Sequence, residues 1–231
     1  MKLPKMFEGS NEEEMRKVYE RIMSEEPPKS NSQASPANAP NLDGFIYVPT
    51  VNLYVAREKS FLGENWFDCH KGLLGENSRM LTIPEFVEFL KYTKVNHKDI
   101  YDDITEVKSP WRAEWLDADF KVKGEQLYVN YNHILDSSGN LIPKDSDALA
   151  DDTLMTSRTP GISLEDYLDN HTPQGLPKSD VKEGKLYYYA PMKDNKSVAR
   201  FDADSGGAFL SCYRGPSGAI SDLGVRAVRR L

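Results

Sequence analysis

The chain is 231 residues long, with 39% hydrophobic and 28% charged residues, which is enough for one substantial folded core. Its net charge of -7 and its pI near 5.2 argue against nucleic-acid binding, because neutralising phosphates requires a concentrated basic face. No apolar stretch reaches the length needed to cross a bilayer, so we expect no membrane insertion.

The N-terminal sequence and the cysteines both bear on where the protein folds. The first residues lack an apolar run and soon become acidic, so the sequence predicts no secretory signal peptide. Cys69 and Cys212 are too few for a disulfide framework and have no metal-ligand spacing. We therefore predict two buried free thiols in a soluble protein that folds in a reducing compartment. Later delivery to a virion or a cell surface stays open.

The first 42 residues are predicted to form a helix and a linker. Ser10 and Glu13 fit a capping box, and apolar residues follow at helical spacing, which predicts an amphipathic helix over 11–25 within the segment 1–26. A pair of prolines ends it. The polar, Pro-, Ala- and Ser-rich stretch over 27–42 predicts a flexible linker. Because an isolated helix of this length is marginal in water, we expect it to dock on the main domain or to mediate self-association.

A domain that mixes strands and helices is expected over residues 43–231. Thr82 and Glu85 form a second capping box, which opens a helix over 86–94. The run Tyr187–Tyr189 favours a strand with one buried and one exposed face. The other predicted elements are strands over 45–48, 51–55, 127–135 and 185–192, a short helix near 163–169, and, between the last two strands, a mostly irregular region with a turn over 137–140. Few helices and long connections predict an α+β fold and argue against a doubly wound sheet.

Motifs of catalysis and metal binding are not apparent in the sequence. The segment Asp202–Gly207 resembles the start of a calcium loop, but Tyr213 stands where an EF-hand needs its bidentate Glu. The histidines show no HExxH pattern or pair at ligand spacing and are interpreted as solvated or core residues: His70, His97, His133 and His171. Clustered carboxylates lie in polar surroundings that are typical of solvated loops. We therefore predict no catalytic residue, no metal site and no cofactor.

The last 35 residues, 197–231, differ in composition from the rest of the chain. They contain no Lys, Glu, Gln, Met or Trp, and all their basic residues are arginines. Arg226, Arg229 and Arg230 are interleaved with apolar residues, which predicts a terminal strand whose arginines pair locally. Small and turn-forming residues between isolated aromatics can display varied chemistry without depending on one side chain. We interpret this segment as a recognition surface on a rigid frame.

The C-terminal pattern resembles the variable region of target proteins of diversity-generating retroelements. The resemblance rests on ARF-x-A-x-S, A-x-L-x-C-x-R-x-P-S-x-A-x-S and LGVRAVR. Upstream, TIPEFVEFLKYTK, SPWRAEWLDADF and KLYYYAPM are similar to the frame of archaeal and archaeal-virus members of that family. The resemblance covers roughly 43–231 and implies a C-type-lectin-type fold of the formylglycine-generating-enzyme-like subtype, with a variable region over about 198–231.

In that family, template-directed, adenine-specific mutagenesis changes selected codons, mostly Asn codons, while the intervening residues stay fixed. The resemblance implies fixed residues at Arg200, Phe201, Ala203, Ala208, Leu210, Cys212, Arg214, Pro216, Ala219, Leu223, Gly224, Val225 and Arg226. It implies diversified, ligand-binding positions at Asp202, Asp204, Phe209, Ser211, Tyr213, Gly215, Gly218, Ile220 and Asp222, with Gly206 and Gly207 compatible with the same role. The five residue types that such mutagenesis of an Asn codon cannot reach, Lys, Glu, Gln, Met and Trp, are all absent from this segment.

The spacing of these positions agrees with an exposed surface. Many of them step by two, so on a strand they face one side, while Phe201, Leu210 and Cys212 point toward the core. We expect Phe209 and Tyr213 to be the energetic anchors, because aromatic side chains give large contact area at low entropy cost. The acidic members favour a partner with positive charge. The implied function is non-enzymatic recognition of a macromolecular ligand, either a protein or a surface glycan.

Two other classes of function stay open. Formylglycine-generating oxidoreductases share the C-terminal pattern, but the resemblance to them implies two cysteines close together, and only Cys212 lies in this segment. The sugar-binding motifs of lectins, such as Glu-Pro-Asn, are absent from the sequence. A structural protein of virion or surface assembly is a further alternative, in which the N-terminal helix drives self-association.

Overall fold

The computed structural model describes residues 42–106, 109, 111–152 and 154–230. Residues Leu42–Leu231 form one compact unit. The helix predicted over 11–25 and nearly all of the linker predicted over 27–42 lie outside the described residues.

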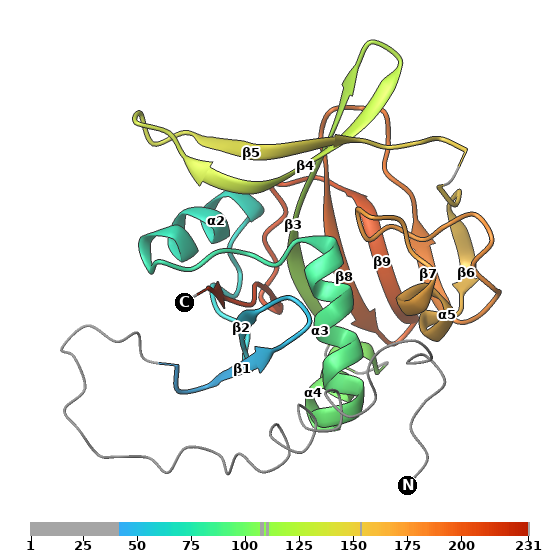
Figure 1. Ribbon diagram of the computed structural model, residues 1–231, viewed down its shortest axis with the longest axis horizontal. Coiled ribbons are helices and arrows are strands. Elements are labelled where there is room, and N and C mark those ends of the chain that lie inside the picture. The colour runs from blue at the N-terminus through green and yellow to red at the C-terminus, as the bar shows by residue number, and fades with distance from the viewer. Residues whose placement is uncertain (1–41, 107–108, 110, 153, 231) are drawn as a thin grey trace, which may run out of the picture. The chain divides into compact units, whose positions relative to one another are not determined.

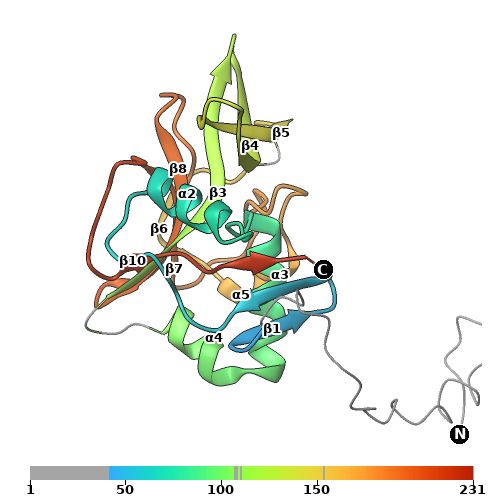
Figure 2. The same cartoon turned by 90° about the vertical axis from the view of Figure 1, so that its left-hand side faces the viewer.

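Two β-sheets organise the fold, which is α+β, as the sequence predicts. The larger sheet has the strand order β5-β4-β3-β8-β9-β7-β6, with β10 beside β3 (Figure 1). The smaller sheet, β1-β2-β11, places the last strand beside the first hairpin (Figure 2). The strands are β1 (Phe45–Val48), β2 (Leu53–Ala56), β3 (Arg112–Lys123), β4 (Gln126–Leu135), β5 (Leu141–Ala148), β6 (Arg158–Ile162), β7 (Leu186–Tyr189), β8 (Ser197–Asp204), β9 (Gly207–Arg214), β10 (Leu223–Gly224) and β11 (Val228–Arg229).

The helices of the described residues are α2 (Trp66–Gly75), α3 (Ile83–Asn96), α4 (Lys98–Thr105) and α5 (Leu164–Asp169). α3 begins at the predicted capping box, in which the Thr82 N–H donates to Glu85 Oε2 at 3.0 Å. The predictions of this helix and of a short helix near 163–169 are confirmed, whereas α2 and α4 were not predicted. None of these helices combines the length and the apolar character needed to span a membrane.

α3 packs against one face of the large sheet and forms the main core with it (Figure 1). The rings of Phe86 on α3 and Phe201 on β8 lie 5.2 Å apart. Phe201, Leu210 and Cys212 are all buried in this cluster, which confirms their predicted orientation toward the core. Full burial of a large apolar side chain stabilises the fold by about 1.5–3 kcal/mol, so this face fixes the geometry of the β8–β9 hairpin.

A second apolar cluster involves α2 and the opposite face of the sheet at β3 and β8. It contains Trp66 of α2, Trp115 of β3 and Val198 of β8. Trp66 Nε1 donates to the carbonyl oxygen of Leu116 at 3.0 Å, which satisfies the indole inside the cluster. Because side chains alternate along a strand, Trp115 and Val198 lie on the face opposite to Phe201. α2 and α3 therefore contribute to cores on opposite faces of the sheet.

The region between the strands β4 and β7 is more regular than the sequence suggests. β5 pairs with β4 from Tyr128↔Ala148 to Leu135↔Leu141. β5 is an edge strand, with mostly exposed polar residues and a proline. Such a strand lacks the apolar alternation by which strands are recognised. The expectation of a mostly irregular region is therefore wrong for this segment.

Candidate binding surface

The predicted site residues lie on the β8–β9 hairpin and in the loop that follows β9. Across the hairpin, Asp202 pairs with Phe209 and Asp204 pairs with Gly207. These pairs alternate with the core pair Phe201↔Leu210, so they belong to the opposite face of the sheet. The structure thus brings the hairpin part of the predicted site to one sheet face.

Four aromatic rings form a row across β7 and β9 on this face, here called the aromatic row: Tyr187, Phe209, Tyr189 and Tyr213. The ring centroids are 4.9 Å apart for Tyr187 and Phe209, 6.4 Å for Tyr189 and Phe209, and 5.0 Å for Tyr189 and Tyr213. All four side chains are half-buried, whereas Tyr188 between the two β7 tyrosines is fully buried. This confirms the two-faced strand predicted there. Tyr187 and Tyr189 were not among the predicted site residues, although their alternation was the available signal.

Asp202 and Ser211 are buried, so their expected exposure is wrong. Asp202 is 3% exposed and Ser211 0% exposed. Asp202 accepts a hydrogen bond from Arg200 Nη2 at 2.8 Å, and Arg200 Nε lies 2.5 Å from its other oxygen. Burial raises the pKa of the Asp202 carboxyl, and the charge of Arg200 opposes the rise. Arg200 is itself held near the rings of Trp111 and Trp115, at 5.2 and 5.8 Å. This ion pair belongs to the frame below the surface.

The hairpin turn places different demands on its two glycines. Gly207 has a φ of +152°, and a Cβ there would lie 2.6 Å from the ring of Tyr187. Gly206 is exposed, and a Cβ there would lie 3.0 Å from a side-chain oxygen of Asp204. The Gly206 N–H donates to that same oxygen at 2.6 Å. A side chain at position 207 is therefore strained and crowded, so Gly207 does not fit a diversified role, whereas Gly206 does.

The loop after β9 holds the remaining predicted site residues. Gly215 is exposed, and a Cβ there would meet open space. A Cβ at Gly218 would make ordinary van der Waals contact with the ring of Trp115 at 3.8 Å. Ile220 is 42% exposed, and Asp222 is half-buried. Because Trp115 belongs to the same sheet face as the aromatic row, the loop and the row share that face.

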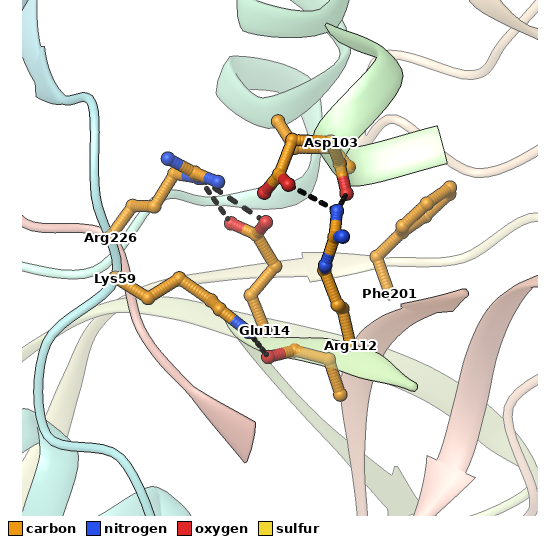
Figure 3. A pocket seen from close by; sticks show the side chains of 8 residues that line it. Lys59, Asp103, Arg112, Glu114, Phe201 and Arg226 are labelled. Carbon is orange, nitrogen blue, oxygen red and sulfur yellow. Dashed lines mark hydrogen bonds and ion pairs between the residues drawn. The ribbon is translucent and has the colours of Figure 1, made fainter. Parts of the chain in front are cut away.

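A charged cluster on the core side of β3 joins the C-terminal segment to the sheet (Figure 3). Arg226 Nε donates to both carboxylate oxygens of Glu114, at 3.2 and 3.0 Å. Arg112 pairs with Asp103. Lys59 Nζ donates to two backbone carbonyls at 3.1 and 2.8 Å, and burial lowers the pKa of this lysine. Because each of these cations is engaged by an oxygen of the protein, we interpret the cluster as a structural clamp.

Arg226 and Arg229 have partners that are distant in the sequence, so the prediction of local pairing is wrong for these two arginines. Glu114, the partner of Arg226, is 112 residues away in the sequence. Arg229 Nε donates to Ser78 Oγ at 2.9 Å, and its guanidinium lies 4.7 Å from the ring of Phe45. The predicted terminal strand is present as β11. Arg226 and Arg229 find distant partners because the C-terminal segment lies against β3 and joins the sheet of the N-terminal hairpin.

Cys69 and Cys212 are both free and buried, as the sequence predicts. Cys212 lies in the main core and Cys69 in the second cluster. Burial raises the pKa of both thiols, that of Cys69 to about 12. A reactive cysteine needs access and a lowered pKa. Neither thiol has these properties.

The structure also assembles a group of residues that sequence reasoning missed. His70 of α2, Asp117 of β3 and His133 of β4 lie together and are buried. Two of the four histidines are therefore neighbours in space, although the sequence shows them as scattered. No spacing rule could reveal this, since the three residues come from three separate elements.

No protein-family model, no curated protein and no solved structure matches this chain. Function is therefore inferred from the geometry of the C-terminal segment and from its sequence pattern.

Proposed function

We propose that this protein is a ligand-binding variable protein of the retroelement-diversified kind, with a C-type-lectin-type fold that displays an exchangeable surface. The observation that carries the proposal is the division of the C-terminal segment between the core and the opposite sheet face. Most positions matched to diversified sites lie on that face or in the loop after β9. We call this surface the recognition face; it comprises Asp204, Gly206, Phe209, Tyr213, Gly215, Gly218, Ile220, Asp222, Tyr187 and Tyr189.

The positions matched to fixed residues are suited to hold a frame. Six of them are apolar and at most 1% exposed: Phe201, Ala203, Leu210, Cys212, Leu223 and Val225. Two fixed arginines, Arg200 and Arg226, form buried ion pairs with acidic partners. Close-packed interiors tolerate little change of side-chain volume, and removing one partner of a buried ion pair strongly destabilises the fold. Variation is therefore cheapest outside this set.

The aromatic row gives the recognition face both constant and changeable contact area. Phe209 and Tyr213 occupy positions matched to diversified sites, whereas Tyr187 and Tyr189 lie on β7, outside the variable segment. Aromatic rings dominate the energetics of many interfaces. A ligand would meet a constant pair of tyrosines surrounded by side chains that differ between variants.

The charge of the recognition face favours a protein ligand with basic groups. Asp204 and Asp222 are half-buried, so their carboxylates are the acidic groups that this variant presents. The third acidic residue of the predicted site, Asp202, is neutralised by Arg200 below the surface. Complementary charge mainly sets association rate and specificity, while the aromatic row supplies the contact area for affinity.

Two displayed libraries of this protein test the proposal. The face library randomises Asp204, Phe209, Tyr213, Gly215 and Ile220. The frame library randomises the same number of fixed positions, Phe201, Ala203, Leu210, Cys212 and Leu223. We expect most members of the face library to resist protease and to yield binders when selected against a panel of basic proteins, whereas the frame library should lose folded members. Equal loss of folding in both libraries, or a folded face library without binders, would contradict the proposal.

The retroelement origin has a separate test in the flanking DNA. We expect a near-copy of the coding segment for residues 197–231, with Asn codons at the diversified positions, beside a reverse transcriptase gene. If the flanking DNA holds no such copy, the proposal that a retroelement diversifies this segment is wrong. The proposal that the face binds a ligand is then tested by the two libraries alone.

Oxidoreductase activity of the formylglycine-generating type has less support, because Cys212 is fully buried with a raised pKa. At about pH 8, we expect a thiol reagent to label neither cysteine in the folded protein and both cysteines after unfolding. Fast labelling of native Cys212 would restore the enzyme alternative.

A further inference from the structure

Three titratable side chains from three elements meet in a buried cluster that the recognition face does not use. His70, Asp117 and His133 are 0%, 1% and 3% exposed. His133 Nδ1 lies 2.5 Å from Asp117 Oδ1, and His70 Nε2 lies 3.5 Å from the same oxygen. Both imidazoles pack edge-on against Trp66, with centroids at 4.2 and 4.9 Å. One candidate ligand atom of each residue lies within 4.8 Å of the others.

The backbone is irregular at two of the three places that supply the residues of this cluster. Asp117 lies where the pairing of β3 with β8 is interrupted, between Trp115 and Asp119. Asn132, next to His133, has a φ of +54°, which is in the left-handed region. Bulges and left-handed residues redirect side chains and are frequent beside functional sites. The His133 N–H also donates to Asp117 Oδ2 at 3.2 Å, which fixes the carboxylate.

His70 is the unexplained member of the cluster. It is fully buried, and neither of its ring nitrogens has a hydrogen-bond partner among the described residues. Asp117 Oδ1 lies 3.5 Å from His70 Nε2, and this oxygen already interacts with His133 Nδ1 at 2.5 Å. Buried polar groups in native proteins are almost always satisfied, so a buried imidazole without a partner indicates a bound group.

We propose that this cluster binds one zinc-class divalent ion through His70 Nε2, His133 Nδ1 and a carboxylate oxygen of Asp117. Imidazole nitrogen and carboxylate oxygen bind zinc tetrahedrally at about 2.0–2.2 Å, which places ligand atoms about 3.3 Å apart. The distance of 3.5 Å from His70 Nε2 to Asp117 Oδ1 is close to that spacing. His133 Nδ1 lies 2.5 Å from the same oxygen, and a small rotation of the His133 ring would widen this distance to the spacing that zinc requires. Calcium and magnesium prefer six or more oxygen ligands, so two imidazoles disfavour them.

The burial of the ligands assigns the ion a structural role. It joins α2 to the neighbouring strands β3 and β4, which carry the other two ligands. Asp117 also lines a small cavity with Thr82, Tyr131 and Gln174. A water would be the fourth ligand of the proposed ion. An ion that binds only the folded chain shifts the unfolding equilibrium toward the folded state.

Metal content and thermal unfolding of the tag-free full chain test this proposal. We expect the purified protein to hold about one zinc per chain, and cobalt added to the metal-free protein to give the intense visible bands of a tetrahedral site. Chelation should lower Tm by about 5–10 °C, and added zinc should restore it. If zinc leaves Tm unchanged and cobalt gives no such bands, the cluster is an ion-free hydrogen-bonded network and the proposal is wrong.

Matched variants locate the ion. We expect His70→Gln and Asp117→Asn to abolish the stoichiometric zinc and the cobalt bands. His97→Gln replaces a half-buried histidine outside the cluster and should keep both. Since the first two variants could also unfold the protein, the cobalt titration of the unmodified chain decides whether a site exists. Retention of zinc by folded His70→Gln, or its loss from folded His97→Gln, would place the ion elsewhere.

Discussion

The two sides of the β8–β9 hairpin carry different structural demands, although their residues alternate along the same strands. On the core side, Phe201 and Leu210 are 1% and 0% exposed and pack in the cluster that includes α3. On the other side, Phe209 and Tyr213 are half-buried and lie in the aromatic row. One pair of strands can thus provide a fixed frame and an exchangeable surface. The comparison teaches that local burial decides which positions can vary.

The alternation is not strict, and its exceptions are informative. Asp202 and Ser211 lie on the outer side by register but are buried, and Gly207 is restricted by its backbone and by Tyr187. Two of these exceptions involve a neighbour outside the hairpin: Tyr187 beside Gly207, and Trp111 near the guanidinium that pairs with Asp202. The following predictions test where the boundary between frame and surface runs.

Truncation on the core side should have the largest effect. Leu210→Ala removes a fully buried side chain, and we expect it to lower the free energy of unfolding by about 2–5 kcal/mol through lost contacts and a residual cavity. Phe201→Ala should cost about 3–5 kcal/mol for the same reason. Denaturant titration followed by tryptophan fluorescence measures both losses. A loss below about 1 kcal/mol would show that these residues do not form a close-packed frame.

Asp202→Ala should have an effect of similar size, and it tests whether burial or strand register decides which positions are fixed. It leaves the guanidinium of Arg200 buried without its carboxylate, which we expect to cost about 3–5 kcal/mol. The control, Asp204→Ala, removes a half-buried carboxylate that accepts the Gly206 N–H in the turn, and should cost about 1 kcal/mol. Equal costs for the two variants would mean that Asp202 is as exchangeable as Asp204.

The two adjacent glycines offer a finer comparison. Gly207→Ala introduces a Cβ at a φ of +152° and 2.6 Å from the ring of Tyr187, and we expect a loss of about 1–3 kcal/mol. Gly206→Ala, in the exposed part of the turn, should change stability by about 0.5 kcal/mol or less. Thermal unfolding of the two variants side by side measures the difference. If Gly207→Ala is as stable as Gly206→Ala, position 207 belongs to the surface.

The sequence predicts the elements that have strong local signals. The capping box at Thr82 marks the start of α3, and the apolar spacing over 45–48 and 127–135 predicts strands that are present. α2 was missed because its sequence, WFDCHKGLLG, contains two glycines and gives a weak helical pattern. β5 was missed because its polar residues reflect an exposed edge. Local pattern thus identifies elements whose apolar faces are regular and fails where solvent or glycine dilutes the signal.

The sequence predicts only the part of the site that follows from the alternation of side chains along a strand. The step of two correctly separates Leu210 and Cys212 from Phe209 and Tyr213. The burial of Asp202 could not be read from the sequence, because it depends on strand pairing and on distant tryptophans. The contribution of β7 to the aromatic row, and the meeting of His70 with His133 and Asp117, likewise arise from the topology of the sheet.

Substitutions within the recognition face should have the smallest effect on stability. A Cβ at Gly215 would meet open space, so we expect Gly215→Ser to change the free energy of unfolding by no more than about 0.5 kcal/mol. Tyr213→Ser removes a ring that packs near the ring of Tyr189 and lies 4.7 Å from the guanidinium of Arg214. We expect it to lower the free energy of unfolding by about 1 kcal/mol, or Tm by about 2–4 °C. Differential scanning calorimetry resolves such shifts when Leu210→Ala is measured in parallel. If Tyr213→Ser destabilised the protein as much as Leu210→Ala, the aromatic row would be part of the core. The surface could not then exchange its side chains without unfolding the frame that presents them.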